Sequence, residues 1–251
     1  MSHAFLFPGQ GSQSTGMGED LFSRFPDLVA EADELLGYSS AELCLSPEKS
    51  EVLGNTAFTQ PALYLTGCLR SRAEREDLGT APTFAAGHSV GEYAALETAG
   101  AVSFGDGLRL VAKRGEIMAK VSGGGMAAVI GLAPETIRDA LDAAGADEVD
   151  LANFNSPGQT VLSGPAAAIE PIGPVMKEAG AKLFVPLKVS GAFHSRMMET
   201  PAREFSAFLE GFSFEKPNLP VVSNVEAVPY PSAEAIPGLL ARQIHSSVRW
   251  T

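Results

Sequence analysis

The segment Thr83-Phe84-Ala85-Ala86-Gly87-His88-Ser89-Val90-Gly91-Glu92-Tyr93-Ala94-Ala95 carries the strongest structural signal in this chain. A short apolar run ends in the pattern Gly-x-Ser-x-Gly, and a helix-forming sequence follows at once. This order of strand, sharp turn and helix is typical of a nucleophile elbow. Gly87 and Gly91 have no Cβ, so they allow the strand and the helix to approach closely. A Gly-Ser turn that merely joins two elements would also fit the five residues, but their context favours Ser89 as a nucleophile above the positive end of the following helix.

The composition fits one large α/β domain, or one such domain carrying a smaller insertion. The chain has 251 residues, of which 45% are hydrophobic and 19% are charged, and these proportions are typical of a soluble globular protein. Its net charge of −12 argues against nucleic acid or an anionic membrane as a partner. An acidic partner would need a local basic patch, which the order of the residues does not locate.

The sequence indicates neither a secreted protein nor a metalloprotein. The two cysteines, Cys44 and Cys68, form no C-x-x-C pair, so we predict neither a disulfide framework nor a zinc site, and we expect no metal. The N-terminus lacks a basic segment followed by an apolar one, and no apolar run reaches membrane-spanning length. We therefore expect a cytoplasmic enzyme that does not associate with membranes.

The N-terminal strand and the turn after it offer backbone hydrogen-bond donors. Residues 3–7 predict a short buried strand, which ends at the glycine-rich turn Pro8-Gly9-Gln10-Gly11-Ser12-Gln13. A dinucleotide-binding turn would need a third glycine where the chain has Ser14, so we exclude that function. The turn provides exposed N–H groups and the amide of Gln10 beside the carboxyl edge of the predicted sheet. Apolar periodicity predicts further helices at residues 26–36, 61–75 and 102–120.

Residues 124–192 have a pattern of their own. They predict strands at 126–132, 149–152, 160–163 and 183–189, helices at 134–144 and 165–179, and a hairpin connection at 153–159. The order β-α-β-β-α-β is that of a ferredoxin-like unit. We therefore predict a hydrolase-like α/β catalytic domain, residues 1–123 and 193–251, with residues 124–192 as an inserted ferredoxin-like subdomain. The large domain resumes with a helix at 197–210, a short strand at 221–222 and a helix at 236–244.

A serine hydroxyl is a weak nucleophile and needs a base within hydrogen-bond reach. Of the four histidines, His194 is the best candidate, because it lies in a loop after a predicted strand, downstream of the serine as in elbow-type hydrolases. The negative charge that develops during acyl transfer needs two donors. We predict that one is the N–H of Val90, next to the nucleophile, and that the other is the backbone N–H of Gln10 or its neighbour. One such donor stabilises the transition state by about 3 kcal/mol.

Seven stretches occur together in a characteristic order. They are Phe-Pro-Gly-Gln-Gly-Ser-Gln (7–13), Thr-Gln-Pro-Ala (59–62), Gly-His-Ser-Val-Gly-Glu-Tyr (87–93), Lys-Arg-Gly-Glu-Ile-Met (113–118), Asn-Phe-Asn-Ser-Pro-Gly-Gln (153–159), Gly-Ala-Phe-His-Ser (191–195) and Arg-Gln-Ile (242–244). Over essentially the whole chain, they resemble the malonyl-CoA:acyl-carrier-protein transacylases of fatty acid synthesis and the related acyltransferase domains of polyketide synthases. The resemblance implies a hydrolase-like α/β fold with a ferredoxin-like insertion, in agreement with the patterns above. Members of this family usually continue beyond the last residues of this chain with another strand.

The resemblance also assigns roles to individual residues. It implies that Arg114 binds the free carboxylate of the substrate, for which a guanidinium offers two parallel hydrogen bonds. It places the side-chain amide of Gln243 behind His194, so we expect Gln243→Glu to weaken malonyl loading by repelling the substrate carboxylate. It assigns Asn155 and Phe193 to substrate binding, and Phe193 is similar to the residue of malonyl-selective members.

The implied reaction has two halves. His194 deprotonates Ser89, which takes the malonyl group from malonyl-CoA, and the phosphopantetheine thiol of acyl carrier protein then accepts that group from the serine. The enzyme itself would need no cofactor and would act as a monomer in fatty acid synthesis. Two other functions compete: a serine esterase or thioesterase, and a non-catalytic relative. An esterase should have an acidic residue behind its histidine, so Arg114 and Gln243 favour acyl transfer, and the intact Ser89 and His194 disfavour a non-catalytic role.

Overall fold

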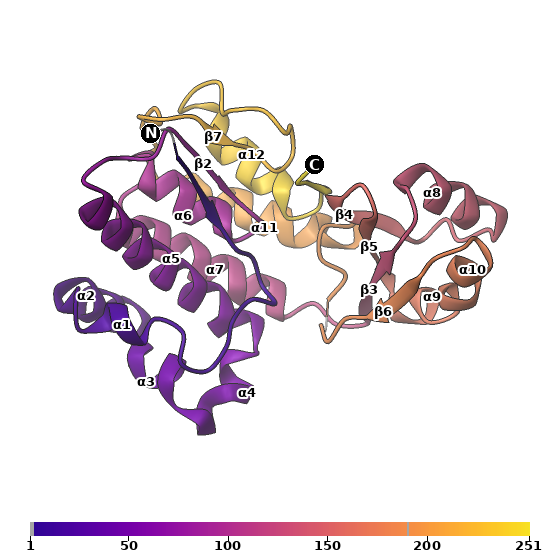
Figure 1. The fold of residues 1–251 in the computed structure, drawn as a ribbon, viewed down its shortest axis with the longest axis horizontal. Helices are drawn as coiled ribbons and strands as arrows, with labels where there is room; N and C mark the ends of the chain where they lie inside the picture. The colour runs from indigo at the N-terminus through magenta and orange to yellow at the C-terminus, as the bar shows by residue number, and fades with distance from the viewer. Residues whose placement is uncertain (1–2, 190) are drawn as a thin grey trace. The chain divides into compact units, whose positions relative to one another are not determined.

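The computed structural model describes residues 3–189 and 191–251, and the contacts among them divide the chain into two compact units. The first unit comprises the residues up to Ile117, Phe208–Ser223 and Val228–Pro237, and the second comprises Met118–Ala207, Asn224–Ala227 and Gly238–Thr251. Figure 1 shows the course of the chain through the elements of each unit. The predicted small subdomain, residues 124–192, lies within the second unit, which also takes in segments that the prediction assigns to the large domain.

The first unit is built on a parallel sheet of three strands in the order β1-β2-β7. The strands are β1 (Ala4–Phe7), β2 (Phe84–Gly87) and β7 (Val221–Val222). Helices make up most of the rest of this unit: α1 (Glu19–Phe22), α2 (Pro26–Leu36), α3 (Ser40–Leu45), the 3-10 helix η1 (Pro47–Lys49), α4 (Ser50–Leu53), α5 (Thr56–Leu78), α6 (Gly91–Thr98) and most of α7 (Phe104–Ala119). A parallel sheet with helical connections is the architecture predicted for the catalytic domain.

The register of β1 and β2 brings two turns to the same edge of this sheet. Phe7 pairs with Gly87, and the N–H of His88 donates to the carbonyl of Phe7 at 2.9 Å. Since parallel strands end at the same edge, the turn after β1 lies beside the turn after β2. A Cβ on Gly9 would lie only 2.6 Å from the carbonyl oxygen of His88, which shows how closely the two turns approach. The N-terminal glycine-rich turn and the turn that holds Ser89 are therefore in contact.

The second unit contains a five-stranded sheet in the order β6-β3-β5-β4-β8. Its elements are β3 (Gly124–Ile130), α8 (Pro134–Ala143), β4 (Asp150–Ser156), β5 (Gln159–Pro165), α9 (Ala166–Ile169), α10 (Ile172–Glu178), β6 (Leu183–Pro186), the 3-10 helix η2 (Arg196–Met198), most of α11 (Glu199–Leu209), most of α12 (Ala235–Gln243) and β8 (Val248–Arg249). The four predicted strands are antiparallel throughout and lie in the order fourth, first, third, second, which confirms the ferredoxin-like unit. The edge strand β8, parallel to β4, is an element that the sequence analysis does not predict.

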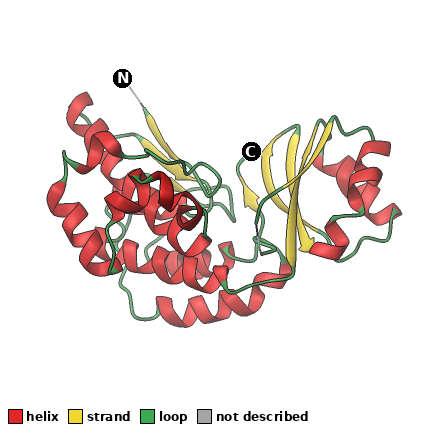
Figure 2. Ribbon diagram, turned by 90° about the horizontal axis from the view of Figure 1, so that it is seen from below, coloured by secondary structure: helices red, strands yellow, loops and turns green. Residues whose placement is uncertain are grey.

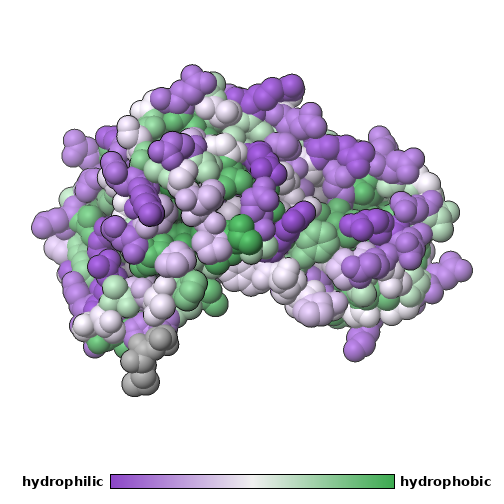
Figure 3. Space-filling view, turned by 90° about the horizontal axis from the view of Figure 1, so that it is seen from above, coloured by the Kyte–Doolittle hydropathy of each residue, from purple (hydrophilic) through white to green (hydrophobic). Residues whose placement is uncertain are grey.

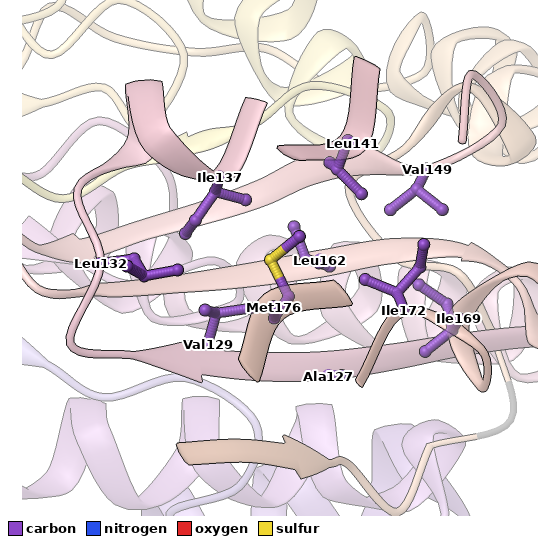
Figure 4. Packing of buried hydrophobic residues seen from close by; sticks show 10 residues of the cluster. All are labelled: Ala127, Val129, Leu132, Ile137, Leu141, Val149, Leu162, Ile169, Ile172 and Met176. Carbon is purple, nitrogen blue, oxygen red and sulfur yellow. The ribbon is translucent and has the colours of Figure 1, made fainter. Parts of the chain in front are cut away.

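The helices α8, α9 and α10 cover one face of this sheet, and a compact core fills the space between them (Figures 2 and 4). The core side chains are those of Ala127, Val129, Leu132, Ile137, Leu141, Val149, Leu162, Ile169, Ile172 and Met176. A large aliphatic side chain that is fully buried contributes about 1.5–3 kcal/mol to stability. In β3, the core residues Ala127 and Val129 alternate with residues that face the other side of the sheet, as the period of a strand requires.

Two predicted helices differ from the structure by more than two residues at an end or by a break. Helix α5 begins at Thr56 rather than at Pro61, because the side chain of Asn55 accepts a hydrogen bond from a backbone N–H of the first turn at 3.0 Å and caps an earlier start. Pro61 is tolerated near this end, where it removes a single intrahelical bond. The helix predicted for residues 165–179 is divided into α9 and α10, since Pro171 cannot donate the hydrogen bond that would continue α9.

The connection predicted at residues 153–159 is mostly strand. β4 runs to Ser156 and β5 starts at Gln159, so the turn between them is short. Asparagine has a low strand propensity, which makes the two asparagines of this stretch resemble loop residues. Asn155 lies at an irregularity of the pairing between β4 and β5, whereas Asn153 pairs with Val161. Asn155 is therefore fixed within a strand.

Hydrophilic side chains dominate the face shown in Figure 3, and hydrophobic side chains lie between them in small groups. Among the large hydrophobic side chains that are exposed, Leu183, Val185 and Leu187 follow one another along β6 and just after it. Across the part of the chain that the structure describes, no helix is both long enough and apolar enough to cross a bilayer.

Candidate active site

Ser89 lies on a sharp turn between β2 and α6, as the sequence predicts. Its φ angle is 52°, in the left-handed region that residues other than glycine rarely adopt. Helix α6 begins two residues later, and Ser89 is only 9% exposed. A strained main chain therefore holds the hydroxyl in a largely enclosed position at the start of a helix.

The glycines of this turn are required because main chains pack against them. A Cβ on Gly87 would lie 1.9 Å from the carbonyl carbon of Gly91, and a Cβ on Gly91 would lie 2.4 Å from the carbonyl oxygen of Phe7. Both distances are far below van der Waals contact, and the atoms met belong to the backbone. Neither glycine can gain a side chain unless β1, β2 or α6 moves.

Two backbone N–H groups near Ser89, those of Val90 and Gln10, have no hydrogen-bond acceptor among the residues that the structure describes. Val90 immediately precedes α6, so its N–H lies at the positive end of that helix. The side chain of Gln10 is engaged elsewhere, because its Nε2 donates to Thr56 Oγ1 at 2.9 Å. This bond anchors the turn and leaves its backbone available. A pair of free donors at a nucleophile is the arrangement that an oxyanion hole needs.

Arg114 of α7 is completely buried and contacts Ser89. Its Nη2 donates to Ser89 Oγ at 3.0 Å, and its Nη1 donates to Oε1 of Gln60 at 2.7 Å. Its guanidinium carbon lies 5.7 Å from the centroid of the Tyr93 ring, close enough for a cation–π interaction. The fold thus brings together Ser89 and Arg114, two predicted site residues that are 25 positions apart in the chain.

Arg114 places a buried positive charge beside Ser89. Burial lowers the pKa of the Arg114 guanidinium, while Tyr93 and Glu92 act in the opposite direction. Arginine nevertheless stays protonated, because its ordinary pKa is above 12. A buried cation costs free energy unless hydrogen bonds and opposite charge compensate it. An anionic group bound beside Ser89 would supply part of that compensation.

Three further residues of this region were not identified as site residues from the sequence: Gln60, Glu92 and Tyr230. Glu92 lies fully buried in the first turn of α6, and the hydroxyl of Tyr230 donates to its Oε1 at 2.6 Å. Burial raises the pKa of the Tyr230 hydroxyl, and the neighbouring Glu92 raises it further. Gln60 lies in the stretch 59–62 and Glu92 in the stretch 87–93, both of which resemble the family, so the sequence does contain a signal for these two residues. Tyr230 lies 138 positions beyond Glu92 and has no local pattern that could identify it.

In the second unit, the main chain of Gln243 orients His194. The Nδ1 atom of His194 lies 2.7 Å from the backbone carbonyl oxygen of Gln243. A carbonyl can only accept, so Nδ1 carries the proton and Nε2 keeps the lone pair that a general base needs.

This geometry corrects the predicted role of the Gln243 side chain. The partner residue is the predicted one, but the accepting atom is its backbone carbonyl rather than its side-chain amide. The physical reason is that α12 ends at Gln243, and the last carbonyls of a helix have no donor within the helix. The expected effect of Gln243→Glu on malonyl loading, which rests on repulsion between two carboxylates, stays a prediction.

The loop that carries His194 is held firmly within the second unit. His194 has a φ angle of 59° and is 5% exposed, and its N–H donates to the carbonyl of Ile244 at 3.2 Å. The hydroxyl of Ser195 donates to the carbonyl of Ala192 at 2.6 Å. His194 also lines a cavity of about 800 Å³, together with Phe154 and several charged side chains of this unit. A cavity of this size is sufficient for a small-molecule ligand.

Phe193 and Asn155 also belong to the second unit. Phe193 is 6% exposed, and its ring packs so closely on Gly191 that a Cβ there would lie 2.6 Å from it. Asn155 is partly buried within β4. Their assignment to substrate binding stays a prediction.

Within residues 3–189 and 191–251, no cluster of three or more His, Cys, Asp or Glu side chains is placed to hold a metal ion. Both cysteines are free and buried. Burial raises the pKa of the Cys44 thiol to about 12, so this thiol is protonated at neutral pH and is a poor nucleophile.

Comparison with known sequences points to one family. The chain matches the family described as Acyl transferase domain over residues 4–249. It is 50% identical over 248 residues to the polyketide biosynthesis protein ThaF of Burkholderia thailandensis. That alignment covers 99% of this chain and 21% of ThaF, so the chain spans about a fifth of the length of this relative.

Two solved structures share the fold over the whole chain. The malonyl CoA-acyl carrier protein transacylase of Burkholderia pseudomallei is 45% identical, with a TM-score of 0.95 that covers 100% of this chain and 85% of that one. A type II PKS acyl-carrier protein in complex with its malonyl-transacylase gives 42% identity and a TM-score of 0.93, and the match covers 100% of this chain and 83% of that one. These similarities confirm the predicted α/β acyltransferase fold.

Proposed function

The chain belongs to the acyl transferase family, and we propose that it transfers the malonyl group of malonyl-CoA to the phosphopantetheine thiol of an acyl carrier protein. One observation carries this proposal: the buried guanidinium of Arg114 donates to the hydroxyl of Ser89 at 3.0 Å. An activated serine alone would serve many acyl esters. A buried cation beside it selects an acyl group that ends in a carboxylate, and the malonyl group has that property.

In the first half-reaction, Nε2 of His194 takes the proton of Ser89 Oγ as this oxygen attacks the thioester carbonyl. The N–H groups of Val90 and Gln10 bind the oxyanion of the tetrahedral intermediate. The C–S bond then breaks, His194 returns the proton to the sulfur, and coenzyme A leaves as the free thiol. The product is a malonyl ester of Ser89 whose carboxylate binds Arg114.

The second half-reaction reverses these steps with a different thiol. His194 takes the proton of the phosphopantetheine thiol, and the sulfur attacks the ester carbonyl. The C–O bond to Ser89 then breaks, and His194 returns the proton to Ser89 Oγ. Coenzyme A must leave before the carrier protein delivers its thiol, so ping-pong kinetics follow. No group beyond the chain, malonyl-CoA and the carrier protein takes part in this scheme.

We also propose which pathway the malonyl group enters and which carrier proteins accept it. The reaction supplies extender units in fatty acid synthesis, which is the pathway predicted from the sequence. The names of ThaF and of the carrier-protein complex refer to polyketide synthesis, which supports a polyketide carrier protein as a further acceptor. The cytoplasmic location and the monomeric state remain predictions. Cell fractionation would test the location, and native mass spectrometry would test the oligomeric state.

A chase experiment tests the proposal directly. The enzyme is mixed with radiolabelled malonyl-CoA, freed from nucleotide by gel filtration, and divided between buffer and holo acyl carrier protein. In buffer, we expect the label to stay on the enzyme. With holo acyl carrier protein, we expect the label to move to the carrier protein as soon as the two are mixed. Rapid release of free malonate in buffer would instead identify an esterase.

Phe193→Ser is expected to raise methylmalonyl loading relative to malonyl loading by at least about tenfold, because a bulky ring occupies the space that an α-methyl group needs. Rates of acyl-enzyme formation from the two CoA esters provide the measurement. Phe193→Tyr, which keeps the bulk of the ring, is the control and should leave the ratio unchanged. An unaltered ratio in Phe193→Ser would rule out this explanation of selectivity.

A further inference from the structure

The first unit contains two completely buried side chains of opposite charge. Among the Asp, Glu, Lys and Arg residues that the structure describes, only Glu92 of α6 and Arg114 of α7 are completely buried. Both are bonded to Ser89: the N–H of Glu92 donates to its carbonyl at 3.1 Å, and Nη2 of Arg114 donates to its Oγ at 3.0 Å. A buried charge is costly unless an opposite charge compensates it. The fold therefore places each of these charges where the other can compensate it.

Glu92 supplies a full negative charge to the surroundings of Arg114. Burial lowers the pKa of the Arg114 guanidinium, and two neighbours on α6, Tyr93 and Glu92, act against it. The ring centroid of Tyr93 lies 5.7 Å from the guanidinium carbon. Burial raises the pKa of the Tyr93 hydroxyl, which therefore stays protonated at neutral pH. The hydroxyl of Tyr230 donates to Oε1 of Glu92 at 2.6 Å, a distance typical of a hydroxyl bonded to an ionised carboxylate.

The bond from Tyr230 does not by itself explain why residue 92 is a glutamate. The N–H of Tyr230 donates to the carbonyl of Val221 in β7 at 3.0 Å, so the bond from its hydroxyl to Glu92 fastens the start of α6 to the sheet. This connection needs only an acceptor, which glutamine would supply without the cost of burying a charge. The charge of Glu92 therefore has a further role, and Arg114 is the completely buried cation that it can serve.

We propose that Glu92 is the counter-charge of Arg114: it balances the buried guanidinium in the empty site and limits how strongly Arg114 binds the carboxylate of the substrate. The inference rests on the proposed function, since it names a residue that sets the affinity for the malonyl group. Glu92 acts on the substrate through Arg114, so it is a positioning residue rather than a catalytic one. Without Glu92, the substrate would be the main source of compensating charge and would bind more tightly. Tighter binding of the substrate alone does not speed the chemical step.

Binding to variants that cannot form the acyl-enzyme isolates this effect. In the Ser89→Ala background, isothermal titration calorimetry measures the dissociation constants of malonyl-CoA and acetyl-CoA with and without Glu92→Gln. Glutamine keeps an acceptor for Tyr230 and removes the charge. We expect the dissociation constant of malonyl-CoA to fall at least about fivefold, because a like charge near the bound carboxylate is lost. The dissociation constant of acetyl-CoA, which has no carboxylate, should stay unchanged.

Tyr230→Phe is the matched control, because it removes the bond to Glu92 and keeps the charge. In the same Ser89→Ala background, it should lower the melting temperature and leave the ratio of the two dissociation constants unchanged. A parental ratio in Glu92→Gln would overturn the proposal. An equal change of the ratio in Tyr230→Phe would also overturn it, because the bond rather than the charge would then set the preference for malonyl-CoA.

Stability measurements test the charge pair without any substrate. Glu92→Gln should lower the melting temperature, because it leaves the buried guanidinium of Arg114 without its counter-charge. The double variant Glu92→Gln/Arg114→Met should melt at a higher temperature than Glu92→Gln, because neither charge then remains.

A double variant that melts at or below the temperature of Glu92→Gln would overturn the proposal. If Glu92→Gln does not fold, a folded double variant supports the proposal, and an unfolded one overturns it, because Glu92 would then be needed independently of Arg114. If the parent forms no malonyl-enzyme, the proposed function fails, and the stability of these variants alone decides the role of Glu92.

Discussion

Arg114→Met is expected to lower the rate of malonyl transfer from malonyl-CoA to Ser89 by about two to three orders of magnitude, or about 3–4 kcal/mol. Methionine fills much of the volume of the buried side chain but removes the charge and both donors that face Ser89 and Gln60. The substrate carboxylate would then enter an enclosed site without a partner. Stopped-flow or quenched-flow measurement of acyl-enzyme formation gives the rate.

Acetyl-CoA is the control substrate for this variant. It brings no carboxylate, so its slow loading by the parent should persist or increase in Arg114→Met, and the preference for malonyl over acetyl should largely disappear. Circular dichroism and the melting temperature check that the variant is folded. If malonyl and acetyl loading fall by the same factor in a folded variant, Arg114 supports the structure of the site and does not recognise the carboxylate.

Gly87→Ala is expected to lower the free energy of unfolding by at least about 4 kcal/mol. Few single substitutions have so large an effect. The added Cβ would lie 1.9 Å from the carbonyl carbon of Gly91 and 2.0 Å from its oxygen, and backbone atoms cannot rotate away as a flexible side chain can. For a chain of this length, roughly 2–4 °C of melting temperature is lost for each kcal/mol, so the midpoint should fall by about 10 °C or more. Thermal denaturation monitored by circular dichroism measures this fall.

Gly238→Ala is the matched control, because a Cβ at Gly238 meets nothing within 4 Å. Alanine is also the better helix former at this exposed position of α12. This variant should melt at or above the parental temperature. An unchanged melting temperature in Gly87→Ala would mean that β2 and α6 do not pack as closely as the elbow requires.

Patterns confined to a few neighbouring residues were sufficient to predict most of the fold. The elbow is such a pattern, since a strand, two glycines and a helix lie within thirteen residues. Helix α2 and strand β7 have the predicted bounds. The order of strands and helices from β3 to β6 was enough to predict the ferredoxin-like topology.

The sequence-based predictions were wrong where contacts with residues far away in the chain outweighed the local sequence preference. Asn155 has a poor strand propensity, but the residues on both sides of it, Phe154 and Ser156, pair with β5 and keep it in β4. Strand β8 exists only because β4 offers it an edge. The bond from His194 to the carbonyl of Gln243 depends on where α12 ends, and no side-chain pattern reports the end of a helix to that accuracy.

The same limit applies to the site. The positions of Ser89, Val90 and Gln10 could be predicted because they lie in turns that are visible in the sequence. The contact between Arg114 and Gln60 joins two helices 54 positions apart, and the bond between Glu92 and Tyr230 is of still longer range. The exposure of Leu183, Val185 and Leu187 depends on which face of the sheet the helices cover, which a single sequence does not state.

Acyl transfer through Ser89 can be tested by intact-protein mass spectrometry after mixing with malonyl-CoA. We expect the parent to gain one malonyl group, which peptide mapping places on Ser89. Ser89→Ala should gain none, and acetyl-CoA should give little product under the same conditions. A folded parent that gains no malonyl group, or a Ser89→Ala variant that gains as much as the parent, would contradict it.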